Sequence, residues 1–264
     1  GDRDSVLNAA RDVEIIFHLG ALIAIPYSYA APASYLRVNA EGTLNVLQAA
    51  RLAGVRRMVH TSTSEVYGTA QQVPITEEHP LQGQSPYSAS KIAADKMVEA
   101  FYRSFEVPAV IVRPFNTYGP RQSARAILPT IILQCLAGER VRLGHTHPTR
   151  DLNFVEDIVE GFLRAGLVPG IEGKTIQLGS GREISIRDLA LLVARLAGQS
   201  IELDREEVRA RPLASEVERL VADASRAREW LGWVPAVSLE DGVARTLEWF
   251  KAHRRLYPAD TYVV

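Results

Sequence analysis

The stretch RMVHTSTSEVYG (57–68) joins a short apolar run to a turn that holds hydroxyls, a carboxylate and a phenol. Its first half, RMVHTS (57–62), has the same character as EIIFHL (14–19) and AVIVRP (109–114). All three runs are short, mostly apolar and rich in β-branched residues, which is typical of strands buried in a parallel sheet. The sequence therefore predicts three such strands.

Two helical patterns separate these strands, SYLRVNAEGTLNVLQAARLAG (34–54) and SASKIAADKMVEAFYRSF (88–105). The first pattern ends at Gly54, a residue type that commonly stops a helix. Alternating strands and helices imply right-handed crossovers, and hence an α/β fold with a doubly wound parallel sheet. Ligands bind such sheets beyond the carboxyl ends of the strands, so the turn TSTSEVYG (61–68) lies where a site is expected.

The pattern becomes less regular after residue 118. We expect helices within 121–141, 152–167 and 184–198, and a strand over 174–179. The chain contains neither an internal repeat nor a low-complexity tract. The sequence therefore predicts a first domain over 1–118 and a smaller α/β lobe over 119–264, with some segments returning to the first sheet.

The composition is that of an ordinary globular protein, with 47% apolar and 23% charged residues among 264. Thirty Lys and Arg against thirty-one Asp and Glu leave a formal charge of -1, which gives no reason to expect nucleic acid or a membrane surface as partner. The single Cys135 excludes an internal disulfide and a thiolate metal cluster. No apolar run has the length of a membrane span, so we expect a cytoplasmic enzyme without a metal.

Tyr87 and Lys91 stand four residues apart in SPYSASK (85–91), which places both side chains on one face of a helix. A free tyrosine titrates near 10, and a nearby ammonium favours the phenolate. Such a tyrosine is a base closer to neutral pH, and an alcohol that gives it a proton can lose hydride to a nicotinamide. Chance often produces this spacing, so the pair alone is weak evidence for the active site of an oxidoreductase-type reaction, and the surrounding motifs decide.

Six motifs, in order and spacing, resemble the extended short-chain dehydrogenase/reductases that act on nucleotide sugars. They are HLGA (18–21), NAEGTLNVLQAA (39–50), TSTSEVYG (61–68), PYSASK (86–91), RPFNTYGPRQ (113–122) and RDLNFVEDI (150–158). Within that family the chain looks most like the NAD-dependent 4,6-dehydratases acting on nucleotide-linked N-acetylglucosamine. The resemblance implies a Rossmann-like NAD-binding domain over 1–118, a substrate-binding lobe, and a homodimer through a four-helix bundle of helices 34–54 and 88–105.

One feature of that family is absent. A dinucleotide-binding fold normally opens with a strand, a glycine-rich turn and a helix whose N-terminus holds the pyrophosphate. No G-x-x-G-x-x-G or G-x-G-x-x-G occurs near the start of this sequence. We therefore expect the chain to begin partway through the fold, and we do not expect it to hold NAD well by itself.

The resemblance also implies catalytic roles for the opening stretch. Tyr87 would take the proton from the sugar O4 as hydride leaves C4 for NAD, while Lys91 would lower the pKa of Tyr87 and hold the nicotinamide ribose. Thr63 would hydrogen-bond O4. Glu65 would remove the C5 proton, after which the C6 hydroxyl leaves as water and the hydride returns to C6. The product would be a 4-keto-6-deoxy sugar.

Ser64 departs from the pattern, since many sugar-nucleotide dehydratases carry Asp there to protonate the leaving hydroxyl. Relatives that act on GDP-mannose also resemble this chain in their Thr-Ser-Glu, where Glu65 would be both base and acid or Ser64 would position a water. The triplet also resembles that of the UDP-glucuronate decarboxylases. In a further reading, Ser64 and Glu65 only satisfy the turn by local hydrogen bonds.

The remaining candidate residues divide between cofactor and substrate. By resemblance, the cofactor would lie along His18, Leu19, Gly20, Ala21, Ser62 and Pro114, besides Tyr87 and Lys91. The nucleotide-diphosphate sugar would contact Tyr27, Asn116, Arg121, Arg150, Arg211 and Glu216. Arginine forks match phosphate oxygens in geometry and charge, Glu216 resembles a ribose-contacting acid, and Tyr27 offers apolar surface for an N-acetyl methyl.

Two alternatives stay open besides the decarboxylase. A nucleotide-sugar C4-epimerase would use Tyr87, Lys91 and Thr63 but would not need Glu65. A non-catalytic nucleotide-sugar binding protein would explain the missing glycine-rich turn, although the joint presence of all four residues argues against it.

Overall fold

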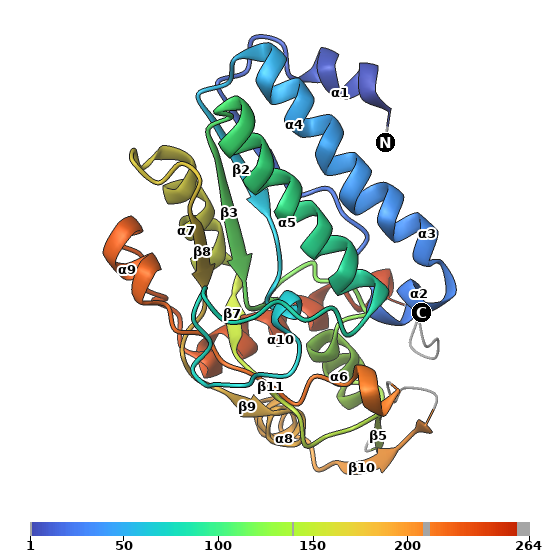
Figure 1. Cartoon of the computed structure of the whole chain (residues 1–264). Coiled ribbons are helices and arrows are strands. Elements are labelled where there is room, and N and C mark those ends of the chain that lie inside the picture. The colour runs from blue at the N-terminus through green and yellow to red at the C-terminus, as the bar shows by residue number, and fades with distance from the viewer. Residues whose placement is uncertain (1, 139, 208–211, 258–264) are drawn as a thin grey trace.

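The structure is a computed structural model that describes residues 2–138, 140–207 and 212–257 (Figure 1). Its main sheet has four parallel strands, in the order β1 (Ile15–His18), β2 (Arg57–Thr61), β3 (Ala109–Pro114) and β8 (Thr175–Leu178). The strands predicted from apolar runs are confirmed, and so is the parallel-sheet α/β class. The strand β8 comes from beyond residue 118 and pairs with β3, so the chain returns to the first sheet.

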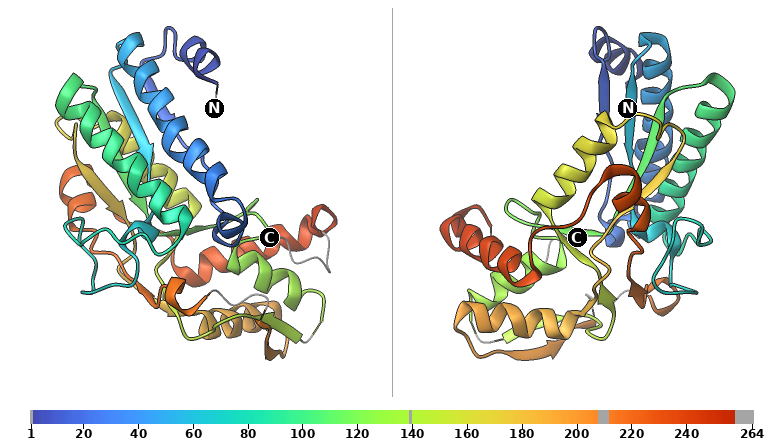
Figure 2. Two further views of the ribbon diagram at one scale, coloured as in Figure 1. Left: turned by 45° about the vertical axis from the view of Figure 1, so that its right-hand side comes forward. Right: turned by 90° about the vertical axis from the view of Figure 1, so that its left-hand side faces the viewer.

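Helices cover both faces of this sheet (Figures 1 and 2). On one face α4 (Gly42–Ala53) and α5 (Pro86–Phe105) lie side by side, and the buried Met58 of β2 packs beneath them. On the other face α7 (Val155–Leu167) packs over the next residue, Val59. Successive strand residues point to opposite faces, so a strand covered on both sides is mostly apolar, and the buried Arg57 and His60 of β2 are exceptions.

The helix predicted over 34–54 is not α-helical throughout, because a π-helical segment separates two α-helical parts. The chain runs from α3 (Pro32–Tyr35) through a π-helical segment, Leu36–Glu41, into α4. Inside the π segment the buried Asn39 turns its amide toward Leu22, accepting from the Leu22 amide nitrogen at 2.8 Å and donating to the Leu22 carbonyl at 3.0 Å. Gly54 ends α4 in the left-handed conformation, as predicted (φ 63°).

Other predicted helices need small corrections at their starts. The range 152–167 opens with a strand, β7 (Leu152–Phe154), because these residues are buried and pair with β4 (Asn116–Tyr118) before α7 begins. Likewise β9 (Ile184–Ser185) precedes α8 (Ile186–Ala197). Pairing with strands that are distant in the sequence is invisible to local periodicity.

Outside the main sheet, the part predicted as the smaller lobe contains three two- or three-stranded sheets and an apolar core formed largely by α6 (Ile127–Cys135), α8 and α10 (Leu239–Ala252). Its strands pair as β5 with β10, as β6 with β9 and β11, and as β4 with β7. The remaining bounds are α1 (Arg3–Ala9), α2 (Ile25–Ala30), β5 (Arg140–Leu143), β6 (Thr149–Arg150), β10 (Glu202–Arg205), β11 (Arg219–Leu220) and α9 (Ser225–Leu231), with 3-10 helices at Ser64–Tyr67 (η2), Leu213–Ser215 (η4) and Arg254–Leu256 (η5).

In the described part of the chain, we find no helix with the length and apolar character needed to cross a membrane.

Candidate active site

The turn after β2 is a 3-10 helix, η2 (Ser64–Tyr67), at the carboxyl end of the sheet. Thr63 caps it, because its Oγ1 accepts the Glu65 amide N–H at 3.2 Å. Gly68 ends it with φ 63° and ψ -155°, a conformation that favours glycine. Thr63, Ser64 and Glu65 are all buried. We call residues 62–67 the catalytic turn from here on.

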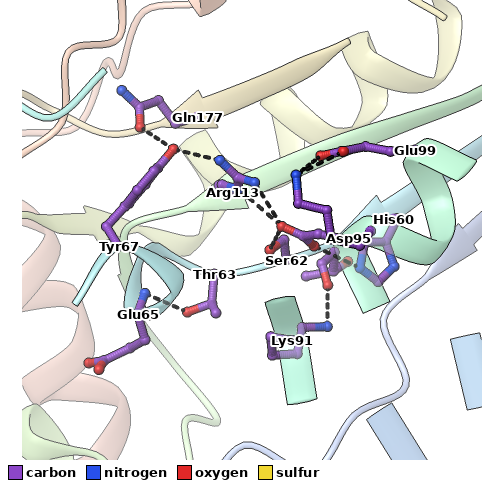
Figure 3. Close-up of polar contacts among 12 residues, drawn as sticks. His60, Ser62, Thr63, Glu65, Tyr67, Lys91, Asp95, Glu99, Arg113 and Gln177 are labelled. Carbon is purple, nitrogen blue, oxygen red and sulfur yellow. Dashed lines mark hydrogen bonds and ion pairs between the residues drawn. The ribbon is translucent and has the colours of Figure 1, made fainter. Parts of the chain in front are cut away.

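Helix α5 brings the predicted base beside this turn. A capping box between Ser85 and Ser88 starts the helix, so Tyr87 lies in its first turn and Lys91 one turn later. Both side chains are buried. The Thr63 side chain lies close enough to the Tyr87 phenol to oppose the rise in its pKa. The Lys91 ammonium donates to the Thr61 carbonyl at 2.6 Å (Figure 3).

The electrostatics of Tyr87 differ from the expectation. Burial raises the pKa of Tyr87 well above its usual value, the nearby Thr63 side chain opposes this, and the nearby Glu65 charge adds to the rise. The prediction that the Lys91 ammonium lowers this pKa stays a prediction, because burial is the largest cause of the rise. Burial lowers the pKa of Lys91 itself to about 8, against the opposing charge of Asp95, and its ammonium is directed to a backbone carbonyl.

The residues predicted to line the cofactor follow the ends of adjacent strands. Leu19 and Gly20 are exposed just beyond β1, with Ala21 half-buried, and Pro114 ends β3. His18 has its Nε2 3.0 Å from Thr43 Oγ1, and burial lowers the pKa of His18 to about 3, so its ring is neutral. Ser62 instead directs its hydroxyl to a buried carboxylate, donating to Asp95 Oδ2 at 2.8 Å.

Two of the predicted substrate residues meet in the smaller lobe. The Arg150 guanidinium lies 3.5 Å from the Glu216 carboxylate and donates to the Val217 carbonyl at 2.8 Å. Both side chains are buried. A carboxylate held beside an arginine is a suitable acceptor for sugar hydroxyls, while the arginine fork suits phosphate.

The other predicted substrate residues are placed separately. Asn116 lies in β4, and its buried Oδ1 has no hydrogen-bond partner among the described residues. Tyr27 is 41% exposed, and its ring is 6.2 Å from that of Tyr35, which in turn meets the Tyr87 ring edge-on at 6.2 Å. Arg121 is exposed in the loop after β4. Arg211 lies outside the described residues.

Sequence reasoning missed several residues beside this site. His145 approaches the second oxygen of Glu216, with its Nδ1 3.1 Å from Oε2, and no local pattern marked it. Asp95 and Arg113 form a buried ion pair of 2.9 Å behind the catalytic turn. Arg113 did carry a signal, because a charged residue inside a predicted buried strand needs a partner.

Comparisons with known proteins agree with this geometry. A family model described as "GDP-mannose 4,6 dehydratase" matches residues 2–246. The UDP-glucose 4-epimerase of Mycolicibacterium smegmatis is 37% identical over 90% of this chain and 76% of its own length. The dTDP-glucose 4,6-dehydratase of Streptomyces griseus is 33% identical over 90% and 72%. The structure of the dTDP-glucose 4,6-dehydratase DesIV from Streptomyces venezuelae, with NAD bound, superposes with a TM-score of 0.88 at 30% identity, covering 97% of this chain and 79% of that one.

Proposed function

The chain belongs to the GDP-mannose 4,6-dehydratase family of NAD-dependent nucleotide-sugar dehydratases and epimerases, which are extended short-chain dehydrogenase/reductases, and from this premise we propose that it is a 4,6-dehydratase. Its substrate would be a nucleotide-diphosphate sugar and its product the 4-keto-6-deoxy sugar. Of the activities in this family, this one gives the Glu65 carboxylate of the catalytic turn a chemical role.

The observation that carries the proposal is the position of Glu65. Its carboxylate is buried, on the same short turn as Thr63, and near enough to Tyr87 for its charge to raise the pKa of that phenol. A C4 oxidation alone needs Tyr87 and Thr63, whereas elimination needs a second base for the C5 proton. The buried Glu65 carboxylate, close to Tyr87, can be this second base.

The residues at the strand ends fit the nicotinamide half of NAD. Thr61 Oγ1 and Asn116 Oδ1 are buried without a partner among the described residues, as expected of atoms that a ligand would satisfy. An ammonium has three N–H donors. Lys91 directs one of them to the Thr61 carbonyl, so the other two can donate to ribose hydroxyls. Lys91, Thr61 and Asn116 would hold this half of NAD, and the bound cofactor would supply the hydride-transfer chemistry at C4 and C6 of the sugar.

The chain's own residues handle the protons. Tyr87, in its phenolate form, would accept the O4 proton while the Thr63 hydroxyl aligns O4. The resulting ketone acidifies the C5 proton, which Glu65 accepts. Glu65 can then give that proton to the departing C6 hydroxyl, since the neighbouring Ser64 is too weak an acid to do so. As hydride returns to C6, C5 takes up a proton from solvent, which balances the O4 proton that Tyr87 releases to solvent.

We propose N-acetylglucosamine linked to UDP or GDP as the sugar. The exposed part of the Tyr27 ring would pack on the N-acetyl methyl, and Arg150, Glu216 and Asn116 would hold the nucleoside diphosphate. A C4-epimerase is the second candidate, because the relative that is 37% identical carries that name.

The test is mass spectrometry of products after incubation of the intact-length enzyme with NAD and a panel of UDP- and GDP-sugars, N-acetylglucosamine forms included. Loss of one water supports the dehydratase. An unchanged mass with altered retention means epimerisation, loss of carbon dioxide from a uronate means decarboxylation, and no change on any sugar favours a binding protein.

The Glu65→Gln variant sharpens this test. We expect water loss to fall by about 10²- to 10⁴-fold, the usual contribution of one acid–base group, while reduction of NAD by the sugar continues. Full turnover by Glu65→Gln would instead favour the epimerase.

A further inference from the structure

A buried polar network lies behind the catalytic turn and reaches both of its ends (Figure 3). At its centre, Asp95 Oδ2 accepts from Ser62 Oγ at 2.8 Å and from the Arg113 guanidinium at 2.9 and 3.1 Å. Arg113 also donates to the Tyr67 hydroxyl at 3.0 Å. Ser62 is the first residue of the turn and Tyr67 is its last, so the Asp95–Arg113 ion pair is hydrogen-bonded to both ends of the turn.

The network extends to the far edge of the sheet. The Tyr67 hydroxyl donates to Gln177 Oε1 at 3.1 Å, and the Gln177 amide nitrogen donates to the Asp223 carbonyl at 2.6 Å. The His60 ring nitrogen lies 3.3 Å from the other Asp95 oxygen. The side chains of Tyr67, Asp95 and Gln177 are completely buried. Water therefore does not compete for these hydrogen bonds.

The two halves of the proposed chemistry come from different elements. Tyr87 and Lys91 are on α5, whereas Thr63 and Glu65 are on the catalytic turn. Asp95 belongs to α5, one helical turn beyond Lys91, yet it binds Ser62 of the turn directly. Arg113, on β3, connects the same carboxylate to the other end of the turn. The pair thus links the helix of the first base to the turn of the second.

We propose that the Asp95–Arg113 pair positions the catalytic turn relative to α5, so that Tyr87 and Glu65 can act on adjacent carbons of one bound sugar. This inference rests on the dehydratase proposed above. Asp95 and Arg113 are positioning residues, since they act through Ser62 and Tyr67. A displacement of about 1 Å between reacting groups lowers rates by about 10²-fold, so the anchoring matters more for turnover than for binding.

The first test uses Tyr67→Phe, which removes one oxygen and leaves the ring contacts with Phe115 and His79 in place. Substitution of Asp95 or Arg113 leaves a buried charge unpaired and can unfold the protein, so the milder variant is the informative one. The matched control is Tyr118→Phe, because the Tyr118 hydroxyl is in a buried side chain of the smaller lobe and donates to the Leu239 carbonyl at 3.3 Å.

For Tyr67→Phe we expect kcat for water loss to fall about tenfold or more with KM changed by less than about twofold, as positioning requires. Amide hydrogen exchange within 62–67, followed by mass spectrometry, should accelerate. For Tyr118→Phe we expect a drop in Tm comparable to that of Tyr67→Phe, with unchanged kcat and unchanged exchange in 62–67.

Equal kcat values for the two variants, or unchanged exchange in 62–67 of Tyr67→Phe, would overturn the inference. Failure of the proposed function is separate, because it shows in the wild-type protein as the absence of water loss. In that case the exchange measurement still tests whether the network holds the turn.

Discussion

The protonation of Lys91 determines the pH range in which this side chain carries a positive charge in the site. Its pKa is lowered to about 8 by burial, so the ammonium is present below pH 8 and is lost above it. We expect kcat/KM, which reports the free enzyme, to decline as the pH rises through about 8. In Lys91→Arg this decline should disappear, because a guanidinium stays protonated, although its different shape will lower the plateau.

The lowered pKa of Lys91 should also make the free energy of unfolding rise with pH, whereas kcat/KM is expected to fall. Between about pH 8 and the ordinary lysine value of 10.5, the unfolded chain binds more protons at this site than the folded chain does. The stability of the wild type should therefore rise with pH in this interval relative to Lys91→Met, measured by urea unfolding at several pH values. A parallel pH dependence of the two proteins would contradict the lowered pKa.

His145 and His147 provide a matched pair of substitutions. His145 is buried against Glu216 at 3.1 Å, while the exposed His147 lies 2.9 Å from the exposed Glu218. We expect His145→Ala to raise KM for the nucleotide sugar by about tenfold, since it removes one of the contacts that orient a carboxylate proposed to hold the ribose. His147→Ala should leave KM unchanged, because an exposed pair contributes little. Equal KM values in the two variants would count against a role of Glu216 in binding.

At the scale of elements, the catalytic turn depends on how it ends. A Cβ at Gly68 would lie 2.6 Å from Gln84 Oε1 and 3.1 Å from the Gln82 carbonyl, in a backbone conformation that other residues avoid. We expect Gly68→Ala to lower the free energy of unfolding by about 1–3 kcal/mol and to impair turnover, because the turn must shift. Steady-state kinetics and urea unfolding measure the two effects.

Gly54 is the control for this substitution. It also has φ 63°, but a Cβ there meets nothing within 4 Å. Gly54→Ala should therefore destabilise by about 1 kcal/mol, with normal turnover. If both variants lost turnover to the same degree, the close contact at Gly68 would not explain the loss.

At the scale of the whole molecule, the homodimer expected from the family resemblance stays a prediction. The helices predicted to form it, α3–α4 and α5, lie side by side on one face of the sheet (Figure 2), and Leu36 beside them is 59% exposed. We expect Leu36→Glu to convert a dimer into a monomer in light scattering after size exclusion, because it would bury a charge. Val234→Glu, at an equally exposed site just after α9, should leave the mass unchanged.

The division into domains at residues 118 and 119 also stays a prediction. The chain does return across that boundary, because β8 pairs with β3 and α7 packs on β2 and β3. Limited proteolysis would show whether the two parts unfold separately.

The sequence by itself determined the buried strands, the helix that carries Tyr87 and Lys91, and the turn that carries Thr63 and Glu65. Those features are local, because apolar periodicity, helix caps and motif spacing are properties of neighbouring residues. Only the tertiary structure decided that Asp95 and Arg113 join, that His145 meets Glu216, and that the Tyr87 pKa rises. Burial and long-range pairing depend on residues far apart in the chain, which is the physical reason why no local pattern revealed them.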